Sequence, residues 1–184
     1  MPAWAPVTYC HVRGVRVHLT LNTLASDREL SEAAELIRRA AQLGVDAFIV
    51  QDLGLVSMCR EIAPTVEVHA STQMSIHNLD GVKLAAKLGC SRVVLARELP
   101  ESEIAAICRE SPVEIEVFGH GALCMCYSGQ CYFSAVIGRR SGNRGQCAQP
   151  CRLPCGYGRY QQQYPLSLKD NCAIEHLLKL EAMG

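Results

Sequence analysis

Cysteine is the residue type in this chain that is most concentrated and most capable of chemistry. The chain has 11 cysteines in 184 residues, and six of them fall within residues 116–155. These six are Cys124, Cys126, Cys131, Cys147, Cys151 and Cys155. Thiolates bind soft metals and carry out redox chemistry, so this segment predicts one of those two functions.

The spacing of the cysteines leaves three interpretations open. Six residues separate Cys124 from Cys131, and fifteen separate Cys131 from Cys147; Cys151 and then Cys155 follow after three residues each, and Cys172 after sixteen more. Structural zinc sites usually contain a pair of ligands two to four residues apart, which the later cysteines allow but the first pair does not. An iron–sulfur cluster needs four thiolates and tolerates varied spacing, so the pattern favours iron–sulfur over zinc and over unligated or redox-active thiols.

The composition predicts a globular domain in a reducing compartment. The formal net charge is zero and 49% of the residues are hydrophobic. The first residues do not read as a signal peptide, and no apolar run is long enough to span a membrane. We therefore expect a cytoplasmic protein with no membrane contact, where structural disulfides are disfavoured.

The neutral total conceals a basic segment. Residues 117–169 contain six arginines and lysines and no acidic residue, so the remainder of the chain carries a net charge of −6. Arginines interleaved with aromatic residues suit contact with phosphates and stacking on bases. We take RNA as a candidate partner, with four candidate RNA-binding residues: Arg139, Arg140, Arg144 and Arg152.

Hydrophobic periodicity predicts strands and helices in alternation. The expected strands are 15–23, 47–50, 66–70, 92–96 and 113–118, with a sixth candidate at 165–168. The helices between them are expected from Ser26 to Gly44, up to Ile62, at 79–88 and at 100–110, and a last one at 173–182. Residues 1–14 contain no clear element.

Strands separated by helices must run parallel, so their carboxyl ends meet at one edge of an open sheet or at one mouth of a barrel. Each expected strand ends in polar residues, which favours a site at this edge. From these strand ends and the cysteine-rich segment we take four candidate catalytic residues: Gln73, Arg97, Glu116 and His120. The sequence lacks the HExxH and GxSxG motifs of hydrolases, although Cys124 with His120 stays open as a hydrolytic pair.

The segment EVFGHGALCMCYSGQCYFS resembles the signature of the collagenase-like peptidase family U-32. Nine positions match that signature: Glu116, Phe118, Gly121, Ala122, Leu123, Cys124, Gly129, Cys131 and Ser134. Phe133 departs from an aliphatic position of the signature. The resemblance continues through HLTLNT, FIVQDLG, HASTQMSIHN, VVLARELP, GNRGQCAQPCR and LSLKDNC. Within the family, the sequences TLNTLASDREL and HASTQMSIHN are most similar to the branch that makes 5-hydroxycytidine in ribosomal RNA.

This resemblance implies a fold, a cofactor and an activity. It implies an incomplete (β/α)8 TIM-type barrel with about six of eight strands, and a [4Fe–4S] cluster, with zinc as the alternative. The implied ligands are Cys124, Cys131, Cys147 and Cys172, with Cys151 as the alternative to Cys147. The implied activity is prephenate-dependent hydroxylation of ribosomal RNA, or of transfer RNA in a sister branch. A collagenase-like endopeptidase and a zinc-stabilised RNA-binding module are the two alternatives.

The resemblance also sets the expected boundaries. We expect an unassigned start at 1–14 and a partial family domain at 15–184, with the cysteine-rich signature segment at 116–155. Because the family ordinarily has two further βα units before this point and continues beyond it, we expect a truncated copy. Unpaired strand edges would then leave the isolated chain inactive.

Overall fold

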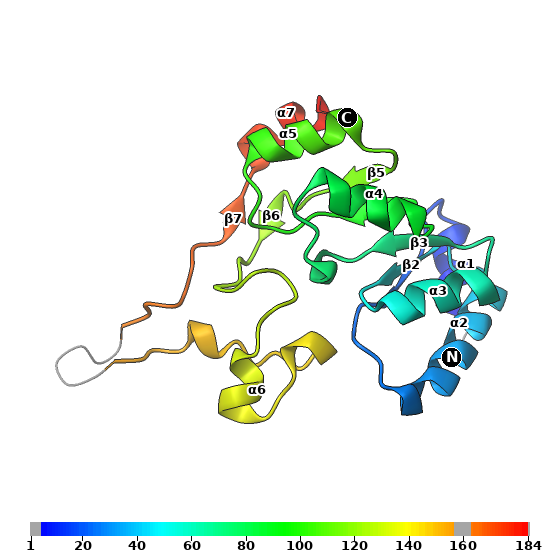
Figure 1. Ribbon diagram of the computed structural model, residues 1–184, viewed down its shortest axis with the longest axis horizontal. Helices are drawn as coiled ribbons and strands as arrows, with labels where there is room; N and C mark the ends of the chain where they lie inside the picture. Colours follow the sequence, from blue (N-terminus) through cyan, green and yellow to red (C-terminus); the bar gives the residue numbers. More distant parts are fainter. Residues whose placement is uncertain (1–4, 157–162, 184) are drawn as a thin grey trace.

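A five-stranded parallel sheet carries the fold (Figure 1). The computed structural model describes residues 5–156 and 163–183. The strands lie side by side in chain order: β1 (His18–Leu21), β2 (Ala47–Val50), β3 (Glu67–Ala70), β4 (Arg92–Val94) and β5 (Glu114–Glu116). Every neighbouring pair is parallel, so all five carboxyl ends lie at the same edge of the sheet.

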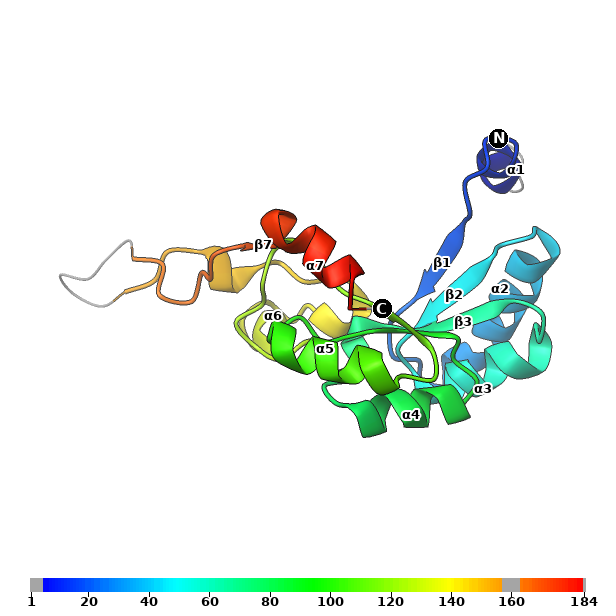
Figure 2. The ribbon, with the colours of Figure 1, turned by 90° about the horizontal axis from the view of Figure 1, so that it is seen from above.

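Helices connect the strands and cover one face of the sheet, as Figure 2 shows for α2 to α5. The helices up to β5 are α1 (Ala5–His11), α2 (Leu30–Gln42), α3 (Leu53–Ile62), α4 (Leu79–Lys87) and α5 (Glu101–Glu110). Side chains cap two of them, because Asp52 accepts hydrogen bonds from the first turn of α3 and Asn78 from that of α4. Ser26 and Glu29 form a capping box ahead of α2.

The hydrophobic core lies between this face of the sheet and the helices. Phe48, Val50, Val68 and Val93 of the strands have no exposed surface, and neither has Ile37 of α2. Because successive strand residues point to opposite faces, these positions alternate with the residues of the other face. Burial of large apolar side chains here is the main stabilising contribution to the fold.

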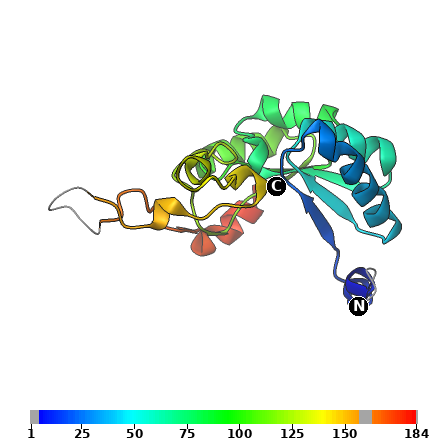
Figure 3. The same cartoon turned by 90° about the horizontal axis from the view of Figure 1, so that it is seen from below.

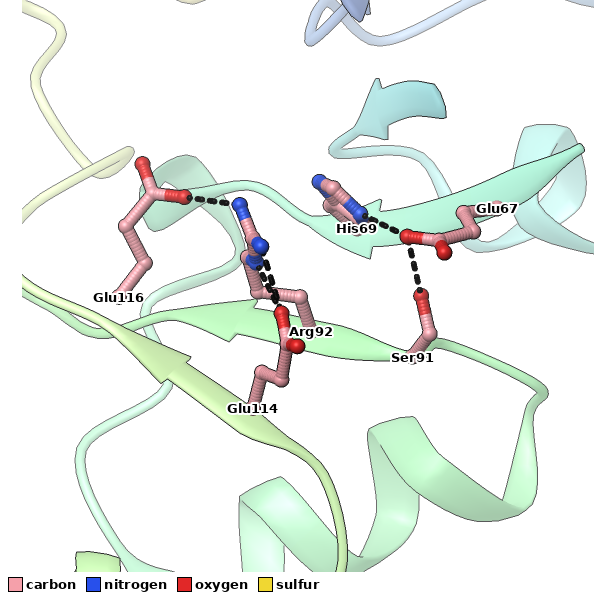
Figure 4. A network of polar contacts seen from close by, with 6 residues as sticks. All are labelled: Glu67, His69, Ser91, Arg92, Glu114 and Glu116. Carbon is pink, nitrogen blue, oxygen red and sulfur yellow. Dashed lines mark hydrogen bonds and ion pairs between the residues drawn. The ribbon is translucent and has the colours of Figure 1, made fainter. Parts of the chain in front are cut away.

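The other face of the sheet carries a polar network (Figure 4). Arg92 lies opposite Glu114 in the register of β4 and β5, and its guanidinium pairs with Glu114 at 2.5 Å and with Glu116 at 3.2 Å. On β3, the fully buried ring of His69 lies 3.0 Å from the Glu67 carboxylate. The one guanidinium of Arg92 is therefore paired with two carboxylates of the neighbouring strand.

The cysteine-rich segment lies beyond one end of the sheet, whereas the last described residues return to α5, where His176 and Lys179 pair with Glu101 (Figure 1). These two parts of the chain contain α6 (Phe133–Gly138), α7 (Leu177–Glu181) and a two-stranded antiparallel sheet of β6 (His120–Gly121) and β7 (Asn171–Cys172). Figure 3 shows α1 set apart from the other helices, at the start of β1. Irregular backbone with short 3-10 turns makes up most of the segment between α6 and β7.

The prediction of a parallel α/β fold is confirmed, and three predictions about its elements are wrong. The five strands and four intervening helices lie where they were expected, but there is no sixth strand at 165–168: Pro165 and Leu166 form a turn, and the next two residues have no regular structure. Pro165 has no backbone N–H, and the Leu168 carbonyl accepts a hydrogen bond from Arg152, so neither group pairs with a strand. The helix expected at 173–182 is a 3-10 turn followed by the shorter α7, and residues 1–14 do contain a helix, α1.

No helix within residues 5–156 and 163–183 has both the length and the apolar character that crossing a membrane requires.

The buried histidine predicts a pH dependence of stability. Burial lowers the pKa of His69 below its ordinary value of 6.5, against the opposing effect of Glu67. The unfolded chain therefore binds this proton more readily than the folded one, and stability is lost as the pH falls below about 6.5. Urea unfolding should show that the free energy of unfolding falls from about pH 7.5 to about pH 5.5, and that His69→Gln reduces this fall.

His120→Gln is the matched control, since His120 is exposed. A pH dependence equal in the wild type and in His69→Gln would contradict the assignment.

Candidate metal centre

A cavity of about 150 Å³ lies where the strand ends meet the cysteine-rich segment. Its walls come from both parts of the chain. The turn after β3 and the end of β4 contribute Thr72, Gln73 and Arg97; the segment contributes Cys124, Ser128, Gly129, Cys131, Ser134, Gly142, Asn143 and Cys147. Three predicted ligands and two predicted catalytic residues thus line one cavity.

Electrostatic coupling places further thiols near these three. Burial raises the pKa of the Cys124 thiol, Arg97 opposes the shift, and the thiols of Cys131, Cys147 and Cys151 raise the pKa further. The pKa of Cys126 is raised by burial and then by a hydrogen bond with Cys131. Cys124, Cys131 and Cys147 thus line the cavity, and Cys126, which lies outside the family pattern, forms a hydrogen bond with Cys131.

The predicted ligand Cys172 and the nearby Cys155 do not line this cavity. Cys172 lies on β7, opposite His120 of β6. Cys155 forms a backbone bridge with Gln163. The structure thus places Cys124, Cys131 and Cys147 in one cavity wall, with neither Cys151 nor Cys172 among its lining residues.

Hydrogen-bond donors point at two of the sulfurs. The Cys147 sulfur accepts from the backbone N–H of Gln149 at 3.4 Å and from the Ser134 hydroxyl at 3.7 Å. The Cys124 sulfur lies 3.7 Å from Nη1 of Arg97. Donors of this kind stabilise thiolates and tune the reduction potential of iron–sulfur clusters.

The donor set fits a thiolate-bound metal or cluster in kind. In the part of the chain that the structure describes, no three side chains of His, Cys, Asp or Glu are arranged closely enough to hold a single metal ion. The thiols are therefore gathered around the cavity without forming a closed single-ion site.

Gln73 and Arg97 supply the polar side chains of the cavity. The Arg97 guanidinium stacks on the Phe118 ring, 4.5 Å from its centroid, and makes no ion pair with a described carboxylate. The Gln73 side-chain oxygen is buried and has no hydrogen-bond partner among the described residues. A cation and a buried unpaired acceptor side by side can bind a polar, anionic ligand.

The other two predicted catalytic residues lie outside this cavity. Glu116 ends β5 and is held by Arg92 on the polar face of the sheet (Figure 4). His120 is exposed on β6 and lines a separate cavity of about 220 Å³ together with Arg97 and Phe118. Arg97 is thus the residue shared by the two cavities.

Two of the four predicted RNA-binding arginines are engaged within the chain. Arg144 forms a two-pronged ion pair with Glu29 and also donates to the Leu24 carbonyl at 3.0 Å. The hydrogen bond from Arg144 is the main cause that lowers the pKa of Glu29 to about 2. Arg152 donates to the carbonyls of Leu123 and Leu168 and pairs with Asp170 at 3.2 Å.

The other two arginines, Arg139 and Arg140, are exposed at the end of α6. Their guanidinium groups make no hydrogen bond or ion pair to residues that the structure describes. The exposed side chain of Tyr132 precedes the same helix. Three further members of the basic and aromatic segment, Tyr157, Arg159 and Tyr160, lie outside the described residues.

Sequence analysis missed Ser128 and Ser134, which are both buried. Ser134 contacts Cys147, and Ser128 contacts Glu98 and the backbone of Arg97. Ser134 is part of the matched signature, so its position there was a usable signal. Ser128 is at a variable position of the signature, and only the neighbouring Gly129 indicates a tight turn.

Comparison with known proteins places the chain among RNA-modifying and peptidase-named relatives. It is 44% identical over 171 residues to the 23S rRNA 5-hydroxycytidine C2501 synthase of Escherichia coli K12, covering 90% of this chain and 26% of that protein. It is 34% identical over 190 residues to tRNA hydroxylation protein P1 of Bacillus subtilis 168, covering 97% of this chain and 45% of that protein. It is 35% identical over 196 residues to a protein of Porphyromonas gingivalis named collagenase, covering 95% of this chain and 46% of that protein.

The chain therefore spans between about a quarter and a half of the length of these relatives. Among solved structures, that of the U32 peptidase Mk0906 shares the fold, with a TM-score of 0.55 and 20% identity over 65% of this chain and 51% of that one. The family model described as peptidase family U32 matches residues 5–184. The chain belongs to peptidase family U32.

Proposed function

We propose that this chain holds a [4Fe–4S] cluster and takes part in the hydroxylation of RNA. The observation that carries the proposal is the convergence of Cys124, Cys131 and Cys147 with Arg97 and Gln73 around one cavity at the strand ends. The names of the relatives from E. coli and B. subtilis support RNA hydroxylation as the activity. We also propose that the sheet is part of a (β/α)8 barrel, whose catalytic mouth this edge would form.

Three cluster ligands in this proposal are Cys124, Cys131 and Cys147, which line the cavity. The fourth ligand is Cys172 by family resemblance, whereas the position of Cys151 supports Cys151 in that role. When bound, the cluster would supply electron transfer or activation of a small substrate. The donors from Ser134, Gln149 and Arg97 to the sulfurs would then hold the thiolates in their orientation.

Arg97 and Gln73 would bind the small co-substrate beside the thiols. The Arg97 guanidinium has no described carboxylate partner and can pair with a carboxylate of a ligand such as prephenate. The unpaired side-chain oxygen of Gln73 would accept a hydrogen bond from a hydroxyl or amino group. Stacking on Phe118 keeps the guanidinium at the cavity wall.

The RNA itself would contact the exposed surface beside the cavity. Arg139 and Arg140 are the arginines of the segment that are free to pair with phosphates within the described residues, and Tyr132 offers a ring for stacking. Arg144 and Arg152 have their guanidinium groups paired within the chain, so we assign them a structural role.

The geometry gives the endopeptidase alternative little support. A serine hydrolase places an imidazole between the hydroxyl and a carboxylate. Here the Glu98 carboxylate lies between Ser128, at 3.2 Å, and His77, at 3.7 Å, so the imidazole does not reach the hydroxyl. Cys124 has Arg97 as its polar partner, and His120 lines a different cavity.

Metal analysis tests the cluster. Protein purified without oxygen should contain about four iron and four acid-labile sulfide per chain, with the absorbance of a [4Fe–4S] cluster. Cys131→Ala should lose most of the iron because a ligand is missing. The iron contents of Cys151→Ala and Cys172→Ala identify the fourth ligand: the cysteine whose replacement lowers the iron content as much as Cys131→Ala does is the ligand.

Cys10→Ala is the control for these variants, because Cys10 lies on α1, away from the thiol cavity. If the protein contains stoichiometric zinc and no sulfide, the cluster proposal is wrong and the zinc-stabilised RNA-binding module takes its place.

Binding of single-stranded RNA tests the assigned surface. The double variant Arg139→Gln/Arg140→Gln should weaken binding and reduce the slope of log K against log salt by about 1.4, because two phosphate contacts are lost. Arg38→Gln/Arg39→Gln, at two exposed positions of α2, removes the same charge and is the matched control; it should leave both the affinity and the slope close to their wild-type values. A slope unchanged in the double variant would contradict the assignment.

The activity is tested in cells by nucleoside analysis. Deleting the gene should remove a hydroxylated nucleoside from digested ribosomal or transfer RNA, and the intact gene should restore it. The Cys131→Ala gene should fail to restore it. An unchanged nucleoside profile after deletion would argue against RNA hydroxylation, and gelatin cleavage lost on Cys124→Ala would favour the endopeptidase.

A further inference from the structure

The loop between Cys124 and Cys131 is attached to the scaffold at its middle. Ser128 is only 3% exposed, although it lies in a loop. Its backbone N–H donates to one oxygen of the Glu98 carboxylate, and its hydroxyl donates to the other oxygen at 3.2 Å. A carboxylate that accepts two hydrogen bonds from one residue fixes both the position and the orientation of that residue.

Ser75 holds the same loop residue from a second direction. The Ser75 hydroxyl donates to the Ser128 carbonyl at 2.5 Å and accepts from the Gln130 side chain at 2.9 Å. Ser75 has a left-handed backbone with φ +58°, a conformation that costs free energy in a residue with a side chain. The strained serine after β3 is thus used to bind the loop.

Gly129 allows the loop to lie directly on the scaffold. Its φ is +79°, and a Cβ atom added to it would lie 2.0 Å from the Gln73 carbonyl oxygen. A side chain at this position cannot be accommodated without moving the loop or the strand end. The glycine therefore marks a contact between two backbones.

The contacts of Ser128 and Gly129 lie close to the thiols of Cys124 and Cys131, both in the sequence and in the cavity wall. Ser128 lies four residues after Cys124 and three before Cys131, and both cysteines line the cavity whose wall includes Ser128 and Gly129. If the middle of the loop detaches, both thiols lose their fixed position relative to Arg97 and Cys147. Because the attached loop is already ordered, a ligand that binds to the thiols does not have to offset the conformational entropy of ordering the loop.

We propose that Glu98, Ser75 and Ser128 are positioning residues that, with the contact at Gly129, hold Cys124 and Cys131 in place for the cluster. The inference rests on the proposed function, because it assigns these thiols as ligands. Glu98 and Ser75 do not line the thiol cavity and act through the loop, by way of Ser128.

Alkylation of the metal-free protein tests the attachment independently of the cluster. We expect Gly129→Ala to increase the rates at which iodoacetamide labels Cys124 and Cys131, followed by mass spectrometry, by about tenfold, which corresponds to about 1.4 kcal/mol of lost attachment. Gly145→Ala is the matched control, since Gly145 has φ +72° and an added Cβ would meet no atom within 4 Å. It introduces the same backbone strain in the same segment without the contact.

Variants of Glu98 provide the second arm. Glu98→Ala should increase labelling of both cysteines as Gly129→Ala does, and Glu98→Gln should give an intermediate rate because its amide oxygen still accepts from the Ser128 N–H. Glu103→Ala, an exposed glutamate on α5, is the control. The melting temperature and the labelling of Cys10 should stay unchanged, which distinguishes a local role from general destabilisation.

The two proposals fail separately. Labelling rates equal in Gly129→Ala and Gly145→Ala, or unchanged in Glu98→Ala, would overturn the positioning role whether or not iron is bound. Wild-type protein that binds no iron, with labelling that rises as expected, would overturn the cluster and keep the positioning role. Iron content that falls in Gly129→Ala and Glu98→Ala, but not in their controls, would support both.

Discussion

The parallel direction of all five strands is the constraint on which the rest of the structure depends. Because the helices return the chain to the same end of the sheet each time, residues after β3 and β4 meet at one edge although some 24 residues separate Gln73 from Arg97. That edge gives the cysteine-rich segment a surface with exposed hydrogen-bonding groups. The thiol cavity lies there, with Thr72, Gln73 and Arg97 from the strand ends in its wall.

Charge links the two parts of the molecule. The acidic scaffold and the basic segment have opposite net charges, and Arg144 spans them by pairing with Glu29 at the start of α2. Within the segment, Arg152 ties the Leu123 carbonyl to Asp170, so a residue next to Cys124 is connected to the chain ahead of β7. A largely irregular segment thus has few apolar contacts of its own and is held by directional hydrogen bonds.

The sequence predicts the scaffold well because its elements are local and periodic. The strand at 47–50 and the helices that follow it have their boundaries set by apolar spacing and by capping residues such as Asp52 and Asn78. The predictions fail where long-range contacts decide the structure. A short alternating stretch at 165–168 looked like a strand, yet Arg152 takes the carbonyl of Leu168 that a strand would have offered to a neighbour.

The site shows the same division between local and long-range information. Cysteine spacing and the signature identified Cys124, Cys131 and Cys147, but no periodicity connects Ser128 to Glu98 and Ser75, which lie 30 and 53 residues away. Charge counting likewise treated Arg144 and Arg139 alike, since composition does not record which guanidinium already has a carboxylate partner. The strand ends, the cysteine loop and the attachment residues all lie within the stretch that matches the family model, so the contacts that shape the thiol cavity in this chain connect parts of the family sequence that are far apart.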